Sequence, residues 1–166
     1  IKAVTEHIKS KVQDPLRETL TVIPAKDGKL YVEKDGNFWA VCLFIPGSMS
    51  YERAQTPELA YQGGVGIGQF QTLLADFDEP LNETIKGFHN IRWRFCQWDE
   101  TIKADPVGRV AEVLEEISWI ESRRDQMLAF WSLVEDGTIP TRVTHNDTKI
   151  SNILFDKESG KVLCAI

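Results

Sequence analysis

The segment from Arg142 to Asp156 holds the residues whose types and spacing best suit a chemical reaction. It contains the pattern His-x-Asp-x-x-x-x-Asn, formed by His145, Asp147 and Asn152. Phosphoryl transfer to a hydroxyl needs a carboxylate that orients the hydroxyl and accepts its proton, and metal ions that balance the phosphate charge. An aspartate followed five residues later by an asparagine can supply both from one loop. The spacing is therefore typical of a phosphoryl-transfer loop.

Each polar residue of this loop has an expected role. Asp147 is the candidate base, and the side-chain oxygen of Asn152 is a candidate ligand for Mg²⁺, which prefers oxygen. Lys149 follows the base by two residues, so its ammonium can offset charge on the transferring phosphoryl group. His145 is expected to support the loop without touching substrate. The alternative is an ordinary polar turn, in which aspartate and asparagine are common.

The elements around the loop favour the catalytic interpretation. Residues 141–144 are predicted to form a short strand before it. A hairpin is predicted after it, with strands at 153–155 and 161–166 that turn through the Lys-Glu-Ser-Gly segment at 157–160. Strands on both sides would hold the loop on a rigid frame.

The first part of the chain predicts a helix followed by strands. Apolar residues recur with helical spacing over 1–12, and Asp14-Pro15 ends this pattern. Further strands are expected at 20–23, 29–33 and 38–45, and the Lys-Asp-Gly-Asn sequence between the last two indicates a hairpin. Residues 38–45 are apolar at every position, which predicts a strand buried on both faces.

Two long helices are expected in the middle of the chain. One begins at Thr56-Pro57 and runs to about Phe77, and the other begins at Asp105-Pro106 and runs to Gly137, with a possible break at 121–124. An aromatic and basic loop is predicted between them at 88–99. The element order as a whole predicts an α+β fold.

The glycine cluster at 63–68 fits neither of the common nucleotide-binding patterns, G-x-G-x-x-G and G-x-x-x-x-G-K-[ST]. It falls within the first of the two long predicted helices. Small residues there are expected to allow close packing against a neighbouring element.

Composition narrows the class of partner. The chain has 166 residues, 42% of them hydrophobic, and a formal net charge of -6. An acidic surface is a poor match for nucleic acids and anionic membranes, so neither is expected as a partner. The three cysteines are far apart and are expected to be small core residues rather than disulfides or zinc ligands. No signal peptide or membrane span is apparent, and a cytoplasmic location is predicted.

The sequence resembles the aminoglycoside phosphotransferase and choline kinase superfamily, and within it most closely the bacterial N-acetylhexosamine 1-kinases. The most specific resemblance lies in the catalytic-loop segment. The residues that carry it are 142–156 and 160–166, with weaker support from 23–29, 73–77 and 88–90. The wider superfamily often has histidine, proline and glycine where this chain has Lys149, Ile150 and Ser151, and this departure favours the hexosamine kinase branch over antibiotic kinases.

The resemblance implies a partial protein-kinase-like fold. Residues 1–46 would be the end of an N-lobe, and 47–166 a partial helical C-lobe with its catalytic loop at 145–152. The hinge residues Phe44, Ile45 and Pro46 would meet the adenine of ATP. A nucleotide-binding lysine would precede Ile1 and a second metal-binding aspartate would follow Ile166. The chain is therefore expected to be a piece of a longer kinase, inactive by itself.

The expected function is ATP- and Mg²⁺-dependent phosphorylation of the anomeric hydroxyl of an N-acetylhexosamine, with a small sugar as the partner. Two alternatives stay open at this point. One is a kinase for another small hydroxyl acceptor, namely an aminoglycoside, choline or an amino alcohol. The other is an inactive kinase-like fragment or binding module.

Overall fold

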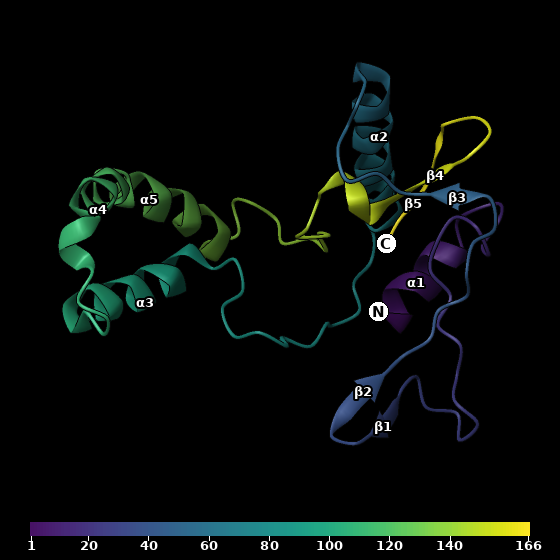
Figure 1. Cartoon of the computed structure of the whole chain (residues 1–166), viewed down its shortest axis with the longest axis horizontal. Helices are drawn as coiled ribbons and strands as arrows, with labels where there is room; N and C mark the ends of the chain where they lie inside the picture. The colour runs from purple at the N-terminus through teal and green to yellow at the C-terminus, as the bar shows by residue number, and fades with distance from the viewer. The chain divides into compact units, whose positions relative to one another are not determined.

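The computed structural model describes residues 1–166, which form two compact units (Figure 1). The first unit comprises Ile1–Glu79 and Arg142–Ile166, and the second comprises Pro80–Thr141. The predicted hinge and the predicted catalytic loop both belong to the first unit. Helices and small antiparallel sheets share the chain, so the predicted α+β class is confirmed.

The first unit contains two α-helices, one 3-10 helix and five short strands. Its helices are α1 (Lys2–Lys9), α2 (Pro57–Leu73) and η2 (Ile150–Asn152). Its strands are β1 (Val32–Lys34), β2 (Asn37–Trp39), β3 (Ser48–Met49), β4 (Ile153–Asp156) and β5 (Val162–Ala165). The second unit is helical, with α3 (Ile91–Ala104), η1 (Val110–Glu112), α4 (Leu114–Glu121) and α5 (Arg124–Glu135). No helix combines the length and apolar character that crossing a bilayer requires.

The predicted hairpin after the catalytic loop is confirmed as β4 and β5, which pair antiparallel. β3 pairs with the other edge of β4, giving the sheet order β3-β4-β5. Alternate residues of β4 point into the core, where Ile153 and Phe155 are almost completely buried. The strand that follows the catalytic loop is thus anchored by its own side chains.

Helix α2 confirms its predicted start, and the predicted close packing of its glycine cluster is confirmed at Gly66. The Thr56 hydroxyl accepts a hydrogen bond from the Leu59 backbone N–H at 3.1 Å, and proline follows in the first turn. A Cβ atom on Gly66 would lie 2.7 Å from Val162 Cγ2 and 3.1 Å from Ile153 Cγ2. The missing side chain therefore lets α2 lie directly on the β4–β5 hairpin.

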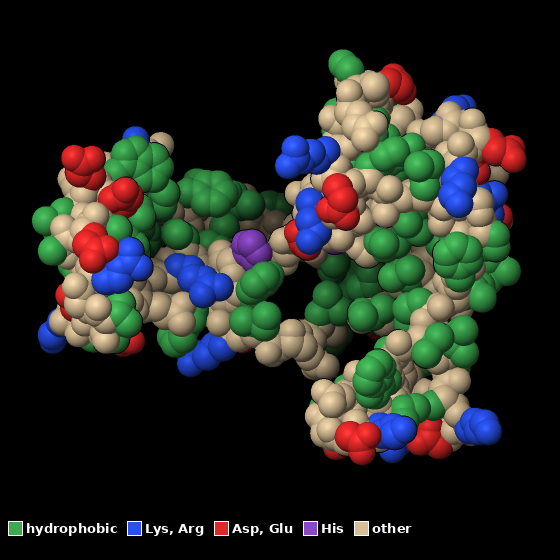
Figure 2. All heavy atoms as spheres, viewed as in Figure 1, with side chains coloured by type: hydrophobic (Ala, Val, Ile, Leu, Met, Phe, Trp, Pro, Cys, Tyr) green, Lys and Arg blue, Asp and Glu red, His purple; other side chains and the backbone are tan.

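The β1–β2 hairpin forms where it was predicted, but the prediction of a doubly buried strand over 38–45 is wrong. Strand β2 ends at Trp39, and the next residues make only an isolated bridge, Val22 to Cys42, with the predicted strand at 20–23. Phe38, Trp39 and Phe44 are more than half exposed because no other element covers this segment. Figure 2 shows hydrophobic side chains at the surface in this region.

The predicted loop at 88–99 is mostly helix. The Asn90 side chain accepts a hydrogen bond from the Trp93 N–H at 2.9 Å and so caps α3. Phe95 of this helix is buried, so the aromatic residues form a packed helical face rather than a loop.

The second long helix begins later than predicted and is interrupted where predicted. Asp105 adopts a left-handed conformation with φ 39° at the end of α3, and its carboxylate accepts hydrogen bonds from the N–H groups of Arg109 and Val110. Pro106 therefore enters a turn, and regular helix starts only at Leu114. The expected break is confirmed between α4 and α5, at residues 122 and 123.

Three smaller predictions were wrong or only partly right. Residues 141–144 form no strand because they have no neighbouring strand, and Arg142 instead donates a hydrogen bond to the Ala75 carbonyl at 2.8 Å. The first helix ends at Lys9, three residues early. Cys164 is a buried core residue as expected, whereas Cys42 and Cys96 are exposed.

Replacing Gly66 by alanine is expected to destabilise the fold by about 1–2 kcal/mol, because the new methyl group would overlap Val162. Gly64 in the same helix has no atom within 4 Å of the place that a methyl group would take, so Gly64→Ala should raise stability by roughly 0.5–1 kcal/mol through helix propensity. Chemical denaturation of the two variants measures both effects. Equal changes in the two variants would contradict the close-packing interpretation.

Hydrogen bonds from Arg124 and Trp98 lower the pKa of the Glu121 carboxyl to about 2. A carboxyl with a lowered folded-state pKa adds stability above its unfolded pKa of about 4.3, and that stability is lost as the pH falls toward 2. The difference in unfolding free energy between the wild-type protein and Glu121→Gln should therefore be largest above pH 5 and shrink toward pH 2. A difference that is constant over this range would contradict the assignment.

Candidate active site

His145 uses both ring nitrogens to hold the loop. Nε2 lies 2.8 Å from the Ile166 carbonyl oxygen and donates to it, and Nδ1 accepts from the Asp147 backbone N–H at 3.3 Å. These two bonds together require a neutral imidazole with its proton on Nε2. The ring also packs edge-on against Phe70 of α2, with centroids 5.5 Å apart. His145 thus contacts the helix, the hairpin end and the candidate base.

The Asp147 carboxylate has one oxygen engaged and one free. Oδ2 accepts from Asn152 Nδ2 at 2.9 Å and lies 3.3 Å from Lys149 Nζ, while Oδ1 has no hydrogen-bond partner in the protein. The Asn152 hydrogen bond and the Lys149 ammonium lower the pKa of this carboxyl. The group is therefore ionised near neutral pH, and Oδ1 can accept a hydrogen bond from a substrate hydroxyl.

Asn152 is oriented by its own amide nitrogen. Nδ2 donates to the backbone oxygen of Asp147 at 2.8 Å as well as to its carboxylate. This leaves the amide oxygen of Asn152 without a protein donor, and a neutral oxygen beside a carboxylate suits a hard divalent cation. The residues present therefore fit Mg²⁺, which Asn152 would help to hold and which would neutralise phosphate charge there. No group of three or more His, Cys, Asp or Glu side chains gathers in residues 1–166 to bind a metal without help from other ligands.

The ends of the loop are closed by backbone hydrogen bonds. The Ile166 N–H donates to the Asn152 carbonyl at 2.9 Å, and the Asn152 N–H donates to the Lys149 carbonyl at 3.0 Å. Asn146 adopts a left-handed conformation with φ 61°, which asparagine tolerates better than most residues, and its side chain accepts from the Thr144 hydroxyl at 2.6 Å. The loop is thus held at both ends and at its turn.

The structure brings His145, Asp147, Lys149 and Asn152 together in one exposed loop. The candidate hinge residues lie on the segment that leads into β3. Ile45 is buried and its carbonyl accepts from the Ser48 hydroxyl at 2.7 Å, so it is committed to the fold. The backbone groups of Phe44 and the carbonyl of Pro46 have no protein partner and are available to a ligand.

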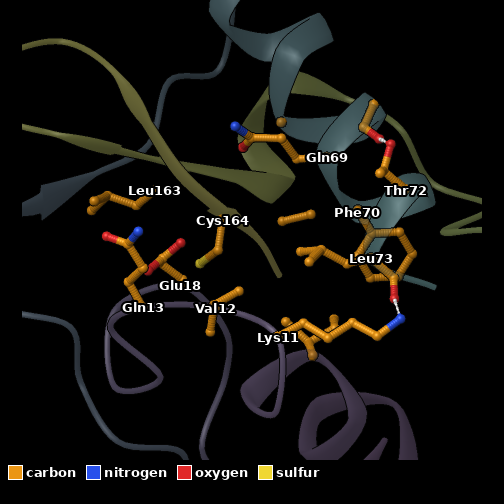
Figure 3. A pocket seen from close by; sticks show the side chains of 14 residues that line it. Lys11, Val12, Gln13, Glu18, Gln69, Phe70, Thr72, Leu73, Leu163 and Cys164 are labelled. Carbon is orange, nitrogen blue, oxygen red and sulfur yellow. Dashed lines mark hydrogen bonds between the residues drawn. The ribbon is translucent and has the colours of Figure 1, made fainter.

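A cavity of about 480 Å³ lies between α1, α2 and β5 (Figure 3). Phe70, Leu73 and Cys164 form part of its wall, and burial raises the pKa of the Cys164 thiol to about 11. This thiol is protonated at neutral pH and is not activated as a nucleophile. None of the predicted site residues lines the cavity.

Sequence reasoning missed the contacts that position the loop. The apolar stripe of a predicted helix includes Phe70 but does not indicate its contact with His145, and Asn146 is only a variable position of the motif. Arg17, which pairs with Asp156 at 2.9 Å, stands in no recognisable pattern. The partners in this last contact are 139 residues apart, and no spacing rule connects them.

A comparison with protein families shows to which family the chain is similar. Residues 14–166, nearly the whole chain and including the loop and the hinge segment, match the phosphotransferase enzyme family. The matched residues include the loop in which Asp147 and Asn152 each have a free side-chain oxygen beside Lys149. The mixed α+β architecture is accordingly a partial kinase-like fold, and the chain belongs to the phosphotransferase enzyme family, within the aminoglycoside phosphotransferase and choline kinase superfamily that its catalytic loop resembles.

Proposed function

We propose that the protein transfers a phosphoryl group from ATP to the anomeric hydroxyl of an N-acetylhexosamine, with Mg²⁺ as the metal. The observation that carries the proposal is the free Oδ1 of Asp147, in a loop where the same carboxylate is held through Oδ2 by Asn152. Membership of a phosphotransferase family supports the reaction class. The choice of sugar rests on the catalytic-loop sequence alone.

The loop can promote the transfer mainly by alignment. Phosphoryl transfer passes through a loose transition state, in which orienting the hydroxyl matters more than base strength. A lowered pKa of Asp147 is compatible with that role, because the carboxylate stays ionised and accepts the hydroxyl proton late. Lys149, which lies beside the engaged oxygen, would stabilise negative charge on the phosphoryl group.

The nucleotide would meet the hinge through the main chain of Phe44 and Pro46, beside the buried Ile45. The proposal has three further parts. Residues 1–46 and 47–166 are partial N- and C-lobes, the protein is cytoplasmic, and residues 1–166 alone are inactive.

Lys149-Ile150-Ser151 supports a hexosamine acceptor over an aminoglycoside, choline or an amino alcohol. An acceptor screen of the complete protein, following ATP consumption, tests this choice. N-Acetylglucosamine and N-acetylgalactosamine should be phosphorylated with the highest kcat/KM. Faster turnover of choline or an aminoglycoside would overturn the proposed acceptor but not the reaction class.

Asp147→Asn is expected to lower kcat by about a hundredfold or more, because the amide cannot accept the hydroxyl proton. KM for ATP should change little. Asp27→Asn, at an exposed turn in the same unit, is the matched control and should keep the wild-type rate. An unchanged kcat in Asp147→Asn would remove Asp147 from the mechanism.

Asn152→Ala is expected to raise the Mg²⁺ concentration for half-maximal rate by about tenfold or more, because it removes a proposed metal ligand and the amide that orients Asp147. Initial rates over a Mg²⁺ titration measure the shift. Asn37→Ala, which removes a hairpin amide far along the chain, serves as the control. An unaltered Mg²⁺ dependence would exclude Asn152 as a ligand.

A further inference from the structure

The turn that follows the candidate hinge is bonded to the strand that follows the catalytic loop. Ser48 pairs with Asp156 in the β3–β4 ladder, and the Lys157 N–H donates to the Gly47 carbonyl at 2.9 Å. Strand β4 begins at Ile153, directly after Asn152. A single strand with a buried face therefore separates the hinge turn from the catalytic loop.

Arg17 adds a third segment to this junction. Its Nη2 donates to Asp156 Oδ2 at 2.9 Å, and the side chains of both residues are less than two-fifths exposed. The same Nη2 would lie 3.8 Å from a Cβ atom on Gly47, so the guanidinium rests against the hinge turn. Arg17 Nε is buried without a partner, and Asp156 is the one acidic group that holds this cation.

Both carboxylate oxygens of Asp156 accept hydrogen bonds. Its Oδ1 accepts hydrogen bonds from the backbone N–H groups of Glu158 and Ser159 and from the Ser159 hydroxyl. These bonds fix the carboxylate on the turn between β4 and β5, while Oδ2 is left for Arg17. The pair is therefore anchored to the hairpin at one end and to the segment after α1 at the other.

We propose that Arg17 is a positioning residue for the nucleotide: its ion pair with Asp156 fixes the candidate hinge relative to the catalytic loop. The inference rests on the proposed function, in which Phe44 and Pro46 meet the adenine. Because Arg17 bonds neither Asp147 nor Asn152, its loss alters the placement of ATP and leaves the acceptor side of the loop intact.

Kinetics of the complete protein test the proposal with Arg17→Gln and Arg17→Lys. Arg17→Gln should raise KM for ATP roughly fivefold, within the range for a partly exposed ion pair, and leave KM for the acceptor within about twofold. Arg17→Lys, which keeps the charge, should recover part of the loss. Arg92→Gln is the matched control, since Arg92 forms a comparable ion pair with Glu135 inside the second unit, and should leave both KM values unchanged.

Titration with a non-hydrolysable ATP analogue measures nucleotide binding separately from phosphorylation of the acceptor. Weaker analogue binding to Arg17→Gln than to wild type supports the positioning role, whether or not an acceptor is phosphorylated. Absence of acceptor phosphorylation would overturn only the proposed function. Equal analogue affinity and equal KM for ATP in both Arg17 variants would overturn the inference. Equal increases in KM for ATP and for the acceptor would also overturn it, because they would show general destabilisation. If Arg17→Gln does not fold, Arg17→Lys gives the same comparison.

Discussion

The close approach of α2 to the β4–β5 hairpin is the contact on which the candidate site depends. Gly66 brings the helix backbone against Val162 and Ile153, and this places Phe70, one turn later, against the ring of His145. A larger residue at position 66 would move the helix and the support of the catalytic loop together. Close packing at Gly66 therefore affects the position of the loop around His145, which contacts α2 about one helical turn away.

The loop itself shows how a site can be rigid and still exposed. Asp147 and Lys149 have side chains that are more than half exposed, so burial does not hold them. Their positions come instead from hydrogen bonds that end on the backbone of Ile166, Asn152 and Asp147. Such a frame leaves one oxygen each on Asp147 and Asn152 open to ligands and water.

What could be predicted from sequence was local. The cap at Thr56, the break before Arg124 and the β4–β5 hairpin follow from short-range rules, and the His-x-Asp-x-x-x-x-Asn pattern lies within one loop. The helix at Ile91–Ala104 was missed because its aromatic and basic residues suggest a loop, although Asn90 offers a cap. The Arg17–Asp156 pair could not be predicted, because only the folded chain brings these residues together.

The uncovered segment after the β1–β2 hairpin has a consequence for handling the protein. Val41 and Phe44 are exposed on a stretch that makes a single bridge on one side and leaves its other edge unpaired, and Phe38 and Trp39 are exposed on β2, which pairs only with β1. Extended, apolar, uncharged segments of this kind pair edge to edge between molecules. Residues 1–166 prepared by themselves would self-associate through this edge, and their solubility would depend on concentration more than the acidic net charge suggests.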